Sequence, residues 1–427
     1  MSLRVFFRTL TGPLHLGLVL ETPMDTRLVE RSWLRRWLFA FLTAIIDRSK
    51  KRRMDTPGPE EFAEIESCGG TYKLIKQPDG VAMSISFTGT GAGLLQMGIG
   101  LDGQHLEFWP SRGIDQRPRQ EPAPMVPAFL PTDKLGLYGR QCPDCHTYFR
   151  TNGIAQVMQC PYCGIRAPME AFTTKNQADF LNRQRELWNT AFHGGDDITI
   201  DLDQIARELP QNRPNCVPRE QAQQYLFRCE KCDSTTDILG EYGACPRCGY
   251  RNSLSVLKTH LEVLDQEFKQ AEAELKDKFE RGQKWQSLLP RYVSGFETMA
   301  GDIHSQLLRL PMVPKRREEV ERISFQQIRP ANEALQKWFA IDIFAGLKHD
   351  DQTFLNREFN RRHLIVHKGG RVDEEYIQKT DDNSVKLNQT IRVRNEDIPR
   401  LSRLVLECGE NLFEQFNSIT SLRSRPK

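Results

Sequence analysis

The sequence of 427 residues predicts a multidomain α+β protein, with a small β-rich module, two four-cysteine modules and a C-terminal all-α four-helix bundle. Three observations support this prediction. Residues 70 to 108 alternate apolar and polar side chains around tight turns, and eight of the 11 cysteines fall in four C-x-x-C pairs. From residue 254 onward, apolar residues recur at helical spacing. A chain of this length with 39% hydrophobic residues can bury several cores.

The expected order of domains follows from changes in composition along the chain. The segments are a basic, apolar extension (1–54), a small β module (55–109), a proline-rich linker (110–135), a first four-cysteine module (136–173), a helical connector (174–222), a second four-cysteine module (223–253), a linking helix (254–286) and a helical bundle (287–420).

The net charge of +3 is small but unevenly distributed along the chain. Residues 1 to 53 hold 11 Lys and Arg against 4 Asp and Glu, which leaves 48 against 52 in the rest. The composition therefore excludes a protein that coats nucleic acid with a uniformly basic surface. Any contact with a polyanion must use a local patch.

The N-terminal extension shows neither a signal peptide nor a membrane span. Residues 1 to 20 are interrupted by proline and histidine and lack a small-residue cleavage site. The apolar run at residues 37 to 46 is too short to cross a bilayer. Residues 33 to 46 do place large apolar side chains at helical spacing before a basic run. We expect such a helix to pack on the protein's own core. The alternatives are a helix that binds a membrane surface or a partner, and a true start at Met54.

The β module is expected to contain two hairpins, one through Pro78-Asp79-Gly80 and one through Asp102-Gly103. The second hairpin contains a formal G-x-G-x-x-G match formed by Gly98, Gly100 and Gly103. A dinucleotide-binding loop must open a helix after a strand, whereas here a turn and Pro110 follow, so we reject that function. Six prolines between residues 110 and 131 predict a stiff linker.

The four C-x-x-C pairs have the spacing of two zinc sites. "CPDC" (142–145) pairs with "CPYCG" (160–164), and "CEKC" (229–232) pairs with "CPRCG" (245–249). A two-residue gap lets one tight turn offer two sulfurs to one tetrahedral ion, and glycine after the second cysteine permits positive φ. We expect two structural zinc ions per chain, each in a closed site, and we expect the protein to be located in the reducing cytoplasm. The expected ligands are Cys142, Cys145, Cys160, Cys163, Cys229, Cys232, Cys245 and Cys248.

Each module resembles a zinc ribbon, and two roles are open for it. In the first role, the ribbons recognise nucleic acid or protein. In the second, zinc only stabilises small units that could not otherwise bury a core. We call the turn that each C-x-x-C pair forms a knuckle. His146 lies beside one knuckle, but four cysteines leave it no place as a ligand. Aromatic and basic residues near the knuckles favour recognition: Tyr148, Phe149, Arg150, Tyr162, Arg166, Arg247, Tyr250 and Arg251.

The helical part begins with an apolar seam at 3-4 spacing from residue 254, which we expect to pack within the same chain. Four helices with short joins then predict the bundle. The helix that contains residues 351 to 368 should stop at Gly369-Gly370. Residues 386 to 398 should form a polar hairpin before the last helix.

One stretch of this bundle resembles a known family. The segment from Arg362 to His367, "RHLIVH", fits the R-(N/D/H)-x-x-x-H motif of the HEPN family, and the following "HKGGRVDEEYI" is also similar. The resemblance covers about the last 130 residues. It implies a bundle that dimerises so that two motifs face each other across a cleft. In many members it also implies a metal-independent endoribonuclease that serves toxin, stress or anti-phage systems.

The side chains of the motif suit RNA cleavage without a metal at the catalytic site. His367 can exchange protons at neutral pH, Arg362 offers a permanently charged fork to a phosphate, and His363 places or assists His367. The expected products are a 2′,3′-cyclic phosphate and a 5′-hydroxyl. Residues five apart lie about 140° apart around a helix, so two chains would complete one site.

Two functions from different classes therefore remain. In the first, the protein is a cytoplasmic homodimeric endoribonuclease that acts on single-stranded RNA or tRNA, and its ribbons recognise nucleic acid or a trigger. In the second, it is a non-catalytic zinc-ribbon adaptor for nucleic acid or protein that dimerises through the bundle. The basic residues of the motif would then only complement the dipole of their own helix.

Overall fold

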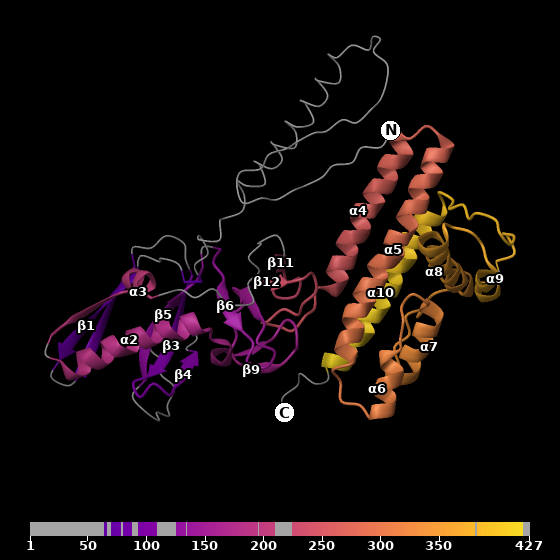
Figure 1. The fold of residues 1–427 in the computed structure, drawn as a ribbon. Helices are drawn as coiled ribbons and strands as arrows, with labels where there is room; N and C mark the ends of the chain where they lie inside the picture. The colour runs from indigo at the N-terminus through magenta and orange to yellow at the C-terminus, as the bar shows by residue number, and fades with distance from the viewer. Residues whose placement is uncertain are drawn as a thin grey trace, which may run out of the picture. The chain divides into compact units, whose positions relative to one another are not determined.

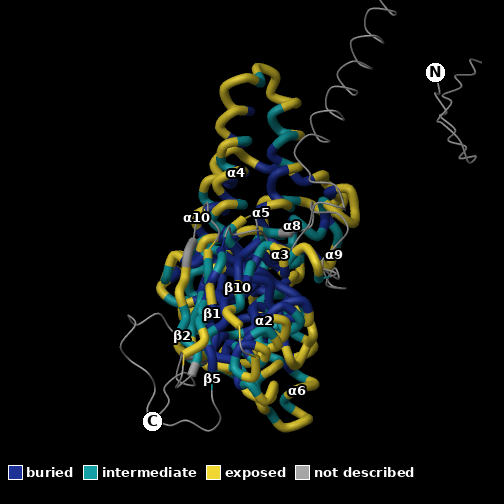
Figure 2. The backbone as a smooth tube through the Cα atoms, turned by 90° about the vertical axis from the view of Figure 1, so that its left-hand side faces the viewer, coloured by how far each residue is buried: buried dark blue, intermediate teal, exposed yellow. Residues whose placement is uncertain are grey.

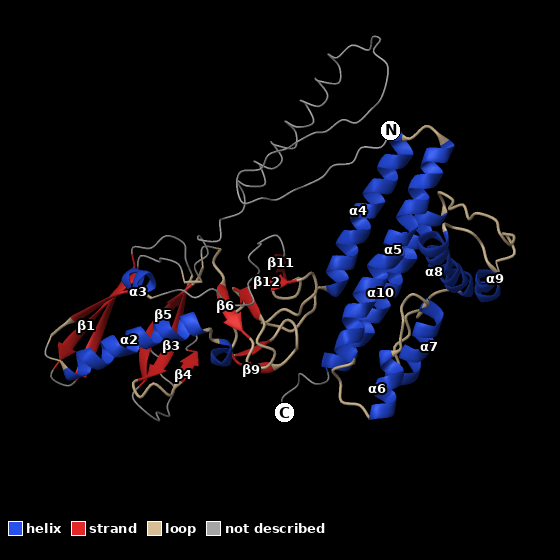
Figure 3. Cartoon of the chain, viewed as in Figure 1, coloured by secondary structure: helices blue, strands red, loops and turns tan. Residues whose placement is uncertain are grey.

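The structure is a computed structural model, and its described residues all belong to one compact unit, Phe62–Lys427. The described ranges are 64–65, 70–77, 80–87, 93–108, 125–133, 135–194, 196–209, 224–380 and 382–421. They form a mixed α+β structure of small antiparallel sheets followed by a helical region (Figures 1 and 3). The extension 1–54, with the helix expected at residues 33–46, lies outside the described residues.

The first sheet contains the predicted hairpin and one distant strand. Strands β1 (Gly70–Gln77) and β2 (Gly80–Phe87) pair antiparallel, and β10 (Ile198–Asp201) pairs with the other edge of β1. Along β1, Tyr72 and Leu74 are buried while Lys73 between them is exposed. This alternation places one face of the sheet in the core.

The second sheet has the order β4-β3-β5. Its strands are β3 (Leu94–Gly100), β4 (Leu106–Phe108) and β5 (Met125–Pro131). The hairpin of β3 and β4 is the predicted one, and it explains the glycine pattern without a nucleotide loop. Residues 125–131, expected to belong to the linker, form β5 instead. Its edge position explains why a strand here tolerates proline.

Helix α2 (Lys175–His193) packs against both sheets, so the region expected to be a connector adds to the core of the β module. A capping box between Thr174 and Gln177 starts the helix. The buried Gln184 accepts hydrogen bonds from the Tyr72 hydroxyl and the Phe129 N–H, both at 3.0 Å, and donates to the Phe129 carbonyl at 2.9 Å. The region continues into β10 and α3 (Leu202–Glu208).

The two cysteine modules share one four-stranded sheet of order β11-β12-β7-β6. The first module contributes β6 (Tyr138–Gln141) and β7 (Tyr148–Thr151), and the second contributes β11 (Gln224–Arg228) and β12 (Thr235–Leu239). Two further strands pair within the first module, β8 (Val157–Gln159) and β9 (Arg166–Pro168), and the short helix η1 (Met169–Phe172) follows them.

Three long helices form the core of the C-terminal region: α4 (Ser253–Glu274), α5 (Lys278–Leu307) and α10 (Asp397–Ser421). They lie side by side in Figures 1 and 2, and the seam of α4 finds its partners within the chain, as expected. Glycine allows their close approach. A Cβ at Gly409 would lie 2.5 Å from Leu257, and one at Gly295 would lie 2.6 Å from His260.

Four shorter helices complete the region: α6 (Pro314–Glu321), α7 (Ile328–Phe339), α8 (His349–Lys368) and α9 (Glu374–Thr380). Helix α8 ends where predicted, since Gly369 and Gly370 have φ of 59° and 76°. The expected hairpin at 386–398 is wrong, because Thr390 forms its bridge with Arg371 instead. Within the described ranges, we find no helix with the length and apolar character that a membrane crossing requires.

Candidate metal centres and histidine site

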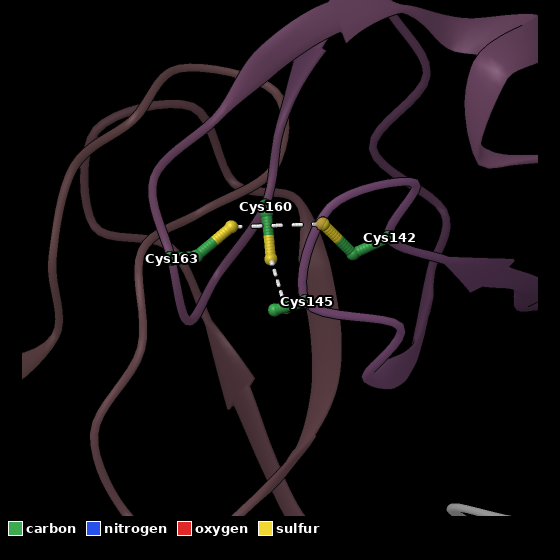
Figure 4. A group of neighbouring side chains, drawn as sticks. All are labelled: Cys142, Cys145, Cys160 and Cys163. Carbon is green, nitrogen blue, oxygen red and sulfur yellow. Dashed lines mark hydrogen bonds between the residues drawn. The ribbon is translucent and has the colours of Figure 1, made fainter.

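The first cysteine group is assembled as the sequence predicts. Cys142, Cys145, Cys160 and Cys163 turn their sulfurs toward a common point (Figure 4). The Sγ atoms of Cys142 and Cys163 are 3.6 Å apart, and those of Cys145 and Cys160 are 3.7 Å apart. Zinc–sulfur bonds of about 2.3 Å at tetrahedral angles place sulfurs about 3.8 Å apart, so this group fits a zinc ion.

The second cysteine group has the same dimensions. Its Sγ atoms are 3.5 Å apart between Cys229 and Cys248 and 3.5 Å apart between Cys232 and Cys245. All four ligand atoms lie within 4.8 Å of one another. Both groups could therefore hold zinc in a closed, four-sulfur shell, whose chemistry would be structural because no coordination position remains for substrate.

All four knuckles repeat one backbone pattern. The residue after the second cysteine donates its N–H to the carbonyl of the first cysteine, at 2.8 to 3.1 Å. This residue has positive φ in every knuckle: His146 (57°), Gly164 (76°), Asp233 (63°) and Gly249 (77°). The sequence predicted this conformation for the two glycines. Histidine and aspartate adopt it as well, and His146 has this backbone role rather than a place among the ligands.

The cysteine pKa values differ within each group because burial is unequal. Burial raises the pKa values of Cys160 and Cys245. For Cys145 and Cys232, burial also raises the pKa, but hydrogen bonds from Thr147 and from Ser234 outweigh it and lower each pKa to about 7. A zinc ion would therefore have to displace protons from thiols such as Cys160 and Cys245, so metal affinity should decrease as the pH falls.

The two ribbons contact each other through matching atoms. The N–H of Gln159 donates to the carbonyl of Pro246 at 2.8 Å, and the N–H of Ala244 donates to the carbonyl of Pro161 at 3.0 Å. In each ribbon, the residue that donates directly precedes the third cysteine, and the residue that accepts directly follows it. Such reciprocity is what a local two-fold relation between two similar units produces. The ribbons therefore form one double ribbon.

A buried ion cluster joins the two ribbons as well. Arg150 of β7 contacts Asp133 at 2.8 Å and donates from Nε to Asp237 of β12 at 2.8 Å. All three residues are at least 94% buried. The two carboxylates offset one desolvated guanidinium, and removal of that guanidinium would leave them unpaired.

Most of the aromatic and basic residues near the knuckles thus serve structure. Tyr148, Phe149 and Arg150 are buried. Arg251 binds Asp302 of α5 through two N–H groups, at 2.6 and 3.1 Å, and attaches the second ribbon to the helical region. Two others form ring or hydroxyl contacts, Tyr162 with Tyr148 and Tyr250 with Phe413. The exposed members of the set are Arg166 and Arg247.

The two histidines of the motif lie together at the end of α8. The ring centroids of His363 and His367 are 4.8 Å apart with the planes inclined by 47°. His367 is exposed and His363 is partly buried. Burial lowers the pKa of His363, and the nearby charges of His367 and Lys368 lower it further. The lowered pKa favours the neutral form of His363, which is the form that can accept a proton.

Arg362 does not join the histidines in the single chain. Its Nη2 donates to Glu297 of α5 at 2.9 Å, with the two side chains 13% and 15% exposed. Burial raises the pKa of Glu297, and the charge of Arg362 opposes this rise. Nε and Nη1 of Arg362 are buried with no hydrogen-bond partner among the described residues. Arg362 thus attaches α8 to α5 on one flank, while His367 lies exposed on another.

The neighbouring Arg361 has a role that the motif did not indicate. Its guanidinium contacts Glu358 and Asp382 at 3.2 Å and Asp397 at 3.5 Å, and it donates to the Tyr376 hydroxyl at 3.2 Å. This network ties α8 to the segment after it. Helical spacing could have found the residue, since position 361 falls on the same face as the buried residues 354, 358 and 364.

A small pocket opens beside His363. Its walls come from the segment before α7, from α8 and from α9. The lining residues are Gln326, Gln327, Asn360, His363, Leu364, Lys368, Asp373, Glu375, Tyr376 and Lys379. Lys379 contacts Glu375 at 2.8 Å, and Lys368 contacts both Asp373 and Glu375. The charges along the pocket are thus paired.

Comparison of the chain with protein-family models, curated proteins and solved structures finds no match to any of them.

Proposed function

We propose that the protein is a metal-independent endoribonuclease of the HEPN type, which acts in the cytoplasm and uses zinc only to hold its double ribbon together. The histidine pair gives this proposal its main support. Two imidazoles 4.8 Å apart at an exposed helix end, one of them with a lowered pKa, are suited to remove and deliver a proton.

The reaction needs one acceptor and one donor of protons. His363 in its neutral form accepts the proton of a ribose 2′-hydroxyl, and the 2′-oxygen then forms a bond to the adjacent phosphorus. The bond from phosphorus to the 5′-oxygen breaks, and His367 in its protonated form donates a proton to that oxygen. The products are a 2′,3′-cyclic phosphate and a 5′-hydroxyl.

Arg362 and the second subunit belong to the same proposal. In one chain, Glu297 holds the guanidinium, so a direct contact with phosphate would require Glu297 to release it. The HEPN resemblance implies a second copy of the motif opposite the first, and such a homodimer would gather two histidine pairs and two arginines at one cleft. A role in toxin or antiviral defence follows from the resemblance alone.

The proposal is tested by RNA cleavage in EDTA. The full-length protein is incubated with single-stranded RNA or tRNA, and elemental analysis after the incubation checks that the ribbon zinc is retained. We expect cleavage with cyclic-phosphate ends and a loss of about 100-fold or more in His363→Gln and His367→Gln. His349→Gln, an exposed histidine at the start of the same helix, serves as the matched control.

Two further substrates and variants sharpen this test. RNA with a 2′-deoxyribose at the cleaved position should resist cleavage, since the nucleophile is missing. Arg362→Ala should lose activity too, and its melting temperature must be measured because the substitution leaves the partly buried Glu297 without its ion pair. Cleavage that persists unchanged in His363→Gln and His367→Gln would contradict the proposal.

A second candidate function is the zinc-ribbon adaptor, and the double ribbon favours it. A shared sheet and a buried ion cluster make a rigid platform that presents Arg166 and Arg247 to solvent. For an adaptor we expect RNA binding without any product. Loss of these two arginines should weaken binding and reduce its salt dependence, because fewer phosphate contacts release fewer counterions.

A further inference from the structure

We infer that the pocket beside His363 is a nucleobase subsite, so that the substrate is single-stranded RNA with an unpaired base next to the scissile phosphate. This inference rests on the proposed function and specifies its substrate. It follows from the charge of the pocket, from its amide groups and from its position against the histidine pair.

The charge of the pocket disfavours a phosphate. Two ammonium groups, those of Lys368 and Lys379, face two carboxylates, those of Asp373 and Glu375, and each ammonium contacts at least one carboxylate. The four charges sum to zero. An anion entering the pocket would meet as much repulsion as attraction, whereas a neutral polar group would not.

The amide groups of the pocket suit the edge of a base. Gln326, Gln327 and Asn360 each combine an N–H donor with a carbonyl acceptor. Gln327 occupies the N-cap position of α7, yet its side chain makes no capping hydrogen bond. Asn360 uses one amide hydrogen on the Asn356 carbonyl at 2.7 Å. The other amide atoms of these three side chains have no hydrogen bond within the described ranges and remain available to a ligand.

The position of the pocket connects base binding to cleavage. His363 lines the pocket and also packs against His367. A base held by the amides and stacked on the imidazole would place its ribose next to the histidine pair. Bases in a duplex have their edges occupied and are stacked on neighbours, so the site selects an unpaired nucleotide.

The test uses DNA oligonucleotides with a single ribonucleotide, so that cleavage can occur at only one position. Four versions place adenine, cytosine, guanine or uracil there. We expect the full-length protein to favour one base by roughly five- to ten-fold, the value of about one net hydrogen bond. Gln326→Leu and Gln327→Leu should reduce this ratio to below about two-fold. Gln336→Leu, an exposed glutamine of α7 that does not line the pocket, should keep it.

A binding measurement separates failure of the pocket from failure of the enzyme. The same four oligonucleotides are prepared with a 2′-O-methyl group, which blocks cleavage, and their affinities are compared. Cleavage with equal rates for all bases, or a preference unchanged in both variants, would overturn the pocket and leave the nuclease. Base-selective binding that Gln327→Leu abolishes, without cleavage of any oligonucleotide, would overturn the nuclease and support the pocket. Absence of both would overturn both.

Discussion

The cysteine groups and the histidine pair differ in how the chain builds them. Each knuckle brings its two sulfurs together within four residues, through one turn and its own backbone hydrogen bonds. The two imidazoles are also close in sequence, yet much of their setting depends on distant segments: Glu297 of α5 holds α8, Gln327 flanks the pocket, and Asp382 binds Arg361 of the same helix. The parts of a candidate metal site can thus be encoded locally, whereas the setting of a candidate catalytic site depends on tertiary contacts.

The largest expected effect is the loss of a zinc ligand. Wild-type protein should contain about two zinc ions per chain, and Cys245→Ser should contain about one or fewer, with a marked loss of stability. The reciprocal hydrogen bonds, from Gln159 to Pro246 and from Ala244 to Pro161, should transmit the damage to the first site. Elemental analysis and thermal unfolding provide the measurements.

Cys408→Ala is the control for the zinc prediction. This buried cysteine of α10 lies outside both groups, so the variant should lose some packing but no zinc. Wild-type protein that is folded without any metal would contradict the assignment of both cysteine groups as zinc sites.

The difference in construction also explains what could be predicted from the sequence. The two four-cysteine groups, the hairpin of β1 and β2 and the glycine stop of α8 all depend on neighbouring residues, and they were predicted. The pairing of β10 with β1 and of Thr390 with Arg371 joins distant segments, and no periodicity indicates it. A proline-rich edge strand resembles a linker because its pattern is that of an unpaired chain.

The next largest effect is expected from breaking the buried ion cluster that joins the two ribbons. Arg150→Met would leave Asp133 and Asp237 buried without a counter-charge, and we expect a loss of about 3–5 kcal/mol in the free energy of unfolding. Denaturant unfolding measures it. Arg228→Met removes an ion pair that is exposed on both sides and should have no measurable effect. Equal effects of the two variants would show that the ribbons fold independently.

Arg361 tests the tertiary frame of the histidine site. Arg361→Lys keeps the charge but loses the fork that reaches Glu358, Asp382 and Tyr376, so we expect a loss of about 2 kcal/mol in unfolding free energy. Hydrogen exchange should increase in residues 373–397. In Arg403→Lys, at an exposed position of α10, neither change is expected. Unchanged exchange in Arg361→Lys would mean that this segment is held by its apolar contacts alone.

Two knuckle glycines provide a finer comparison within the double ribbon. Both have positive φ, which costs an alanine about 1 kcal/mol. A Cβ at Gly249 would also lie 2.7 Å from the Gln159 side chain, whereas at Gly164 the nearest atom is 3.9 Å away. Gly249→Ala should therefore destabilise the fold more than Gly164→Ala. Addition of Gln159→Ala to both variants should make their losses of stability equal. If the losses still differ, the cause lies in the backbone and not in the contact with Gln159.

The smallest expected effect is the pH dependence that His363 contributes to stability. Its pKa in the folded chain is lowered by burial and by His367, Lys368 and Lys379, with Glu375 opposing them. The unfolded chain, with a pKa of about 6.5, therefore binds the proton more readily, and this contribution to stability is complete above about pH 6.5 and declines as the pH falls below it. His363→Gln should flatten the decline relative to wild type, and His367→Gln should flatten it partly because one repelling charge is gone. Thermal unfolding between pH 5 and 7.5 measures both, with His349→Gln as the reference, since loss of ribbon zinc in acid is common to all of them. A decline that is the same in all four proteins would show that the two imidazoles do not interact, and the proton exchange proposed for them would lose its electrostatic basis.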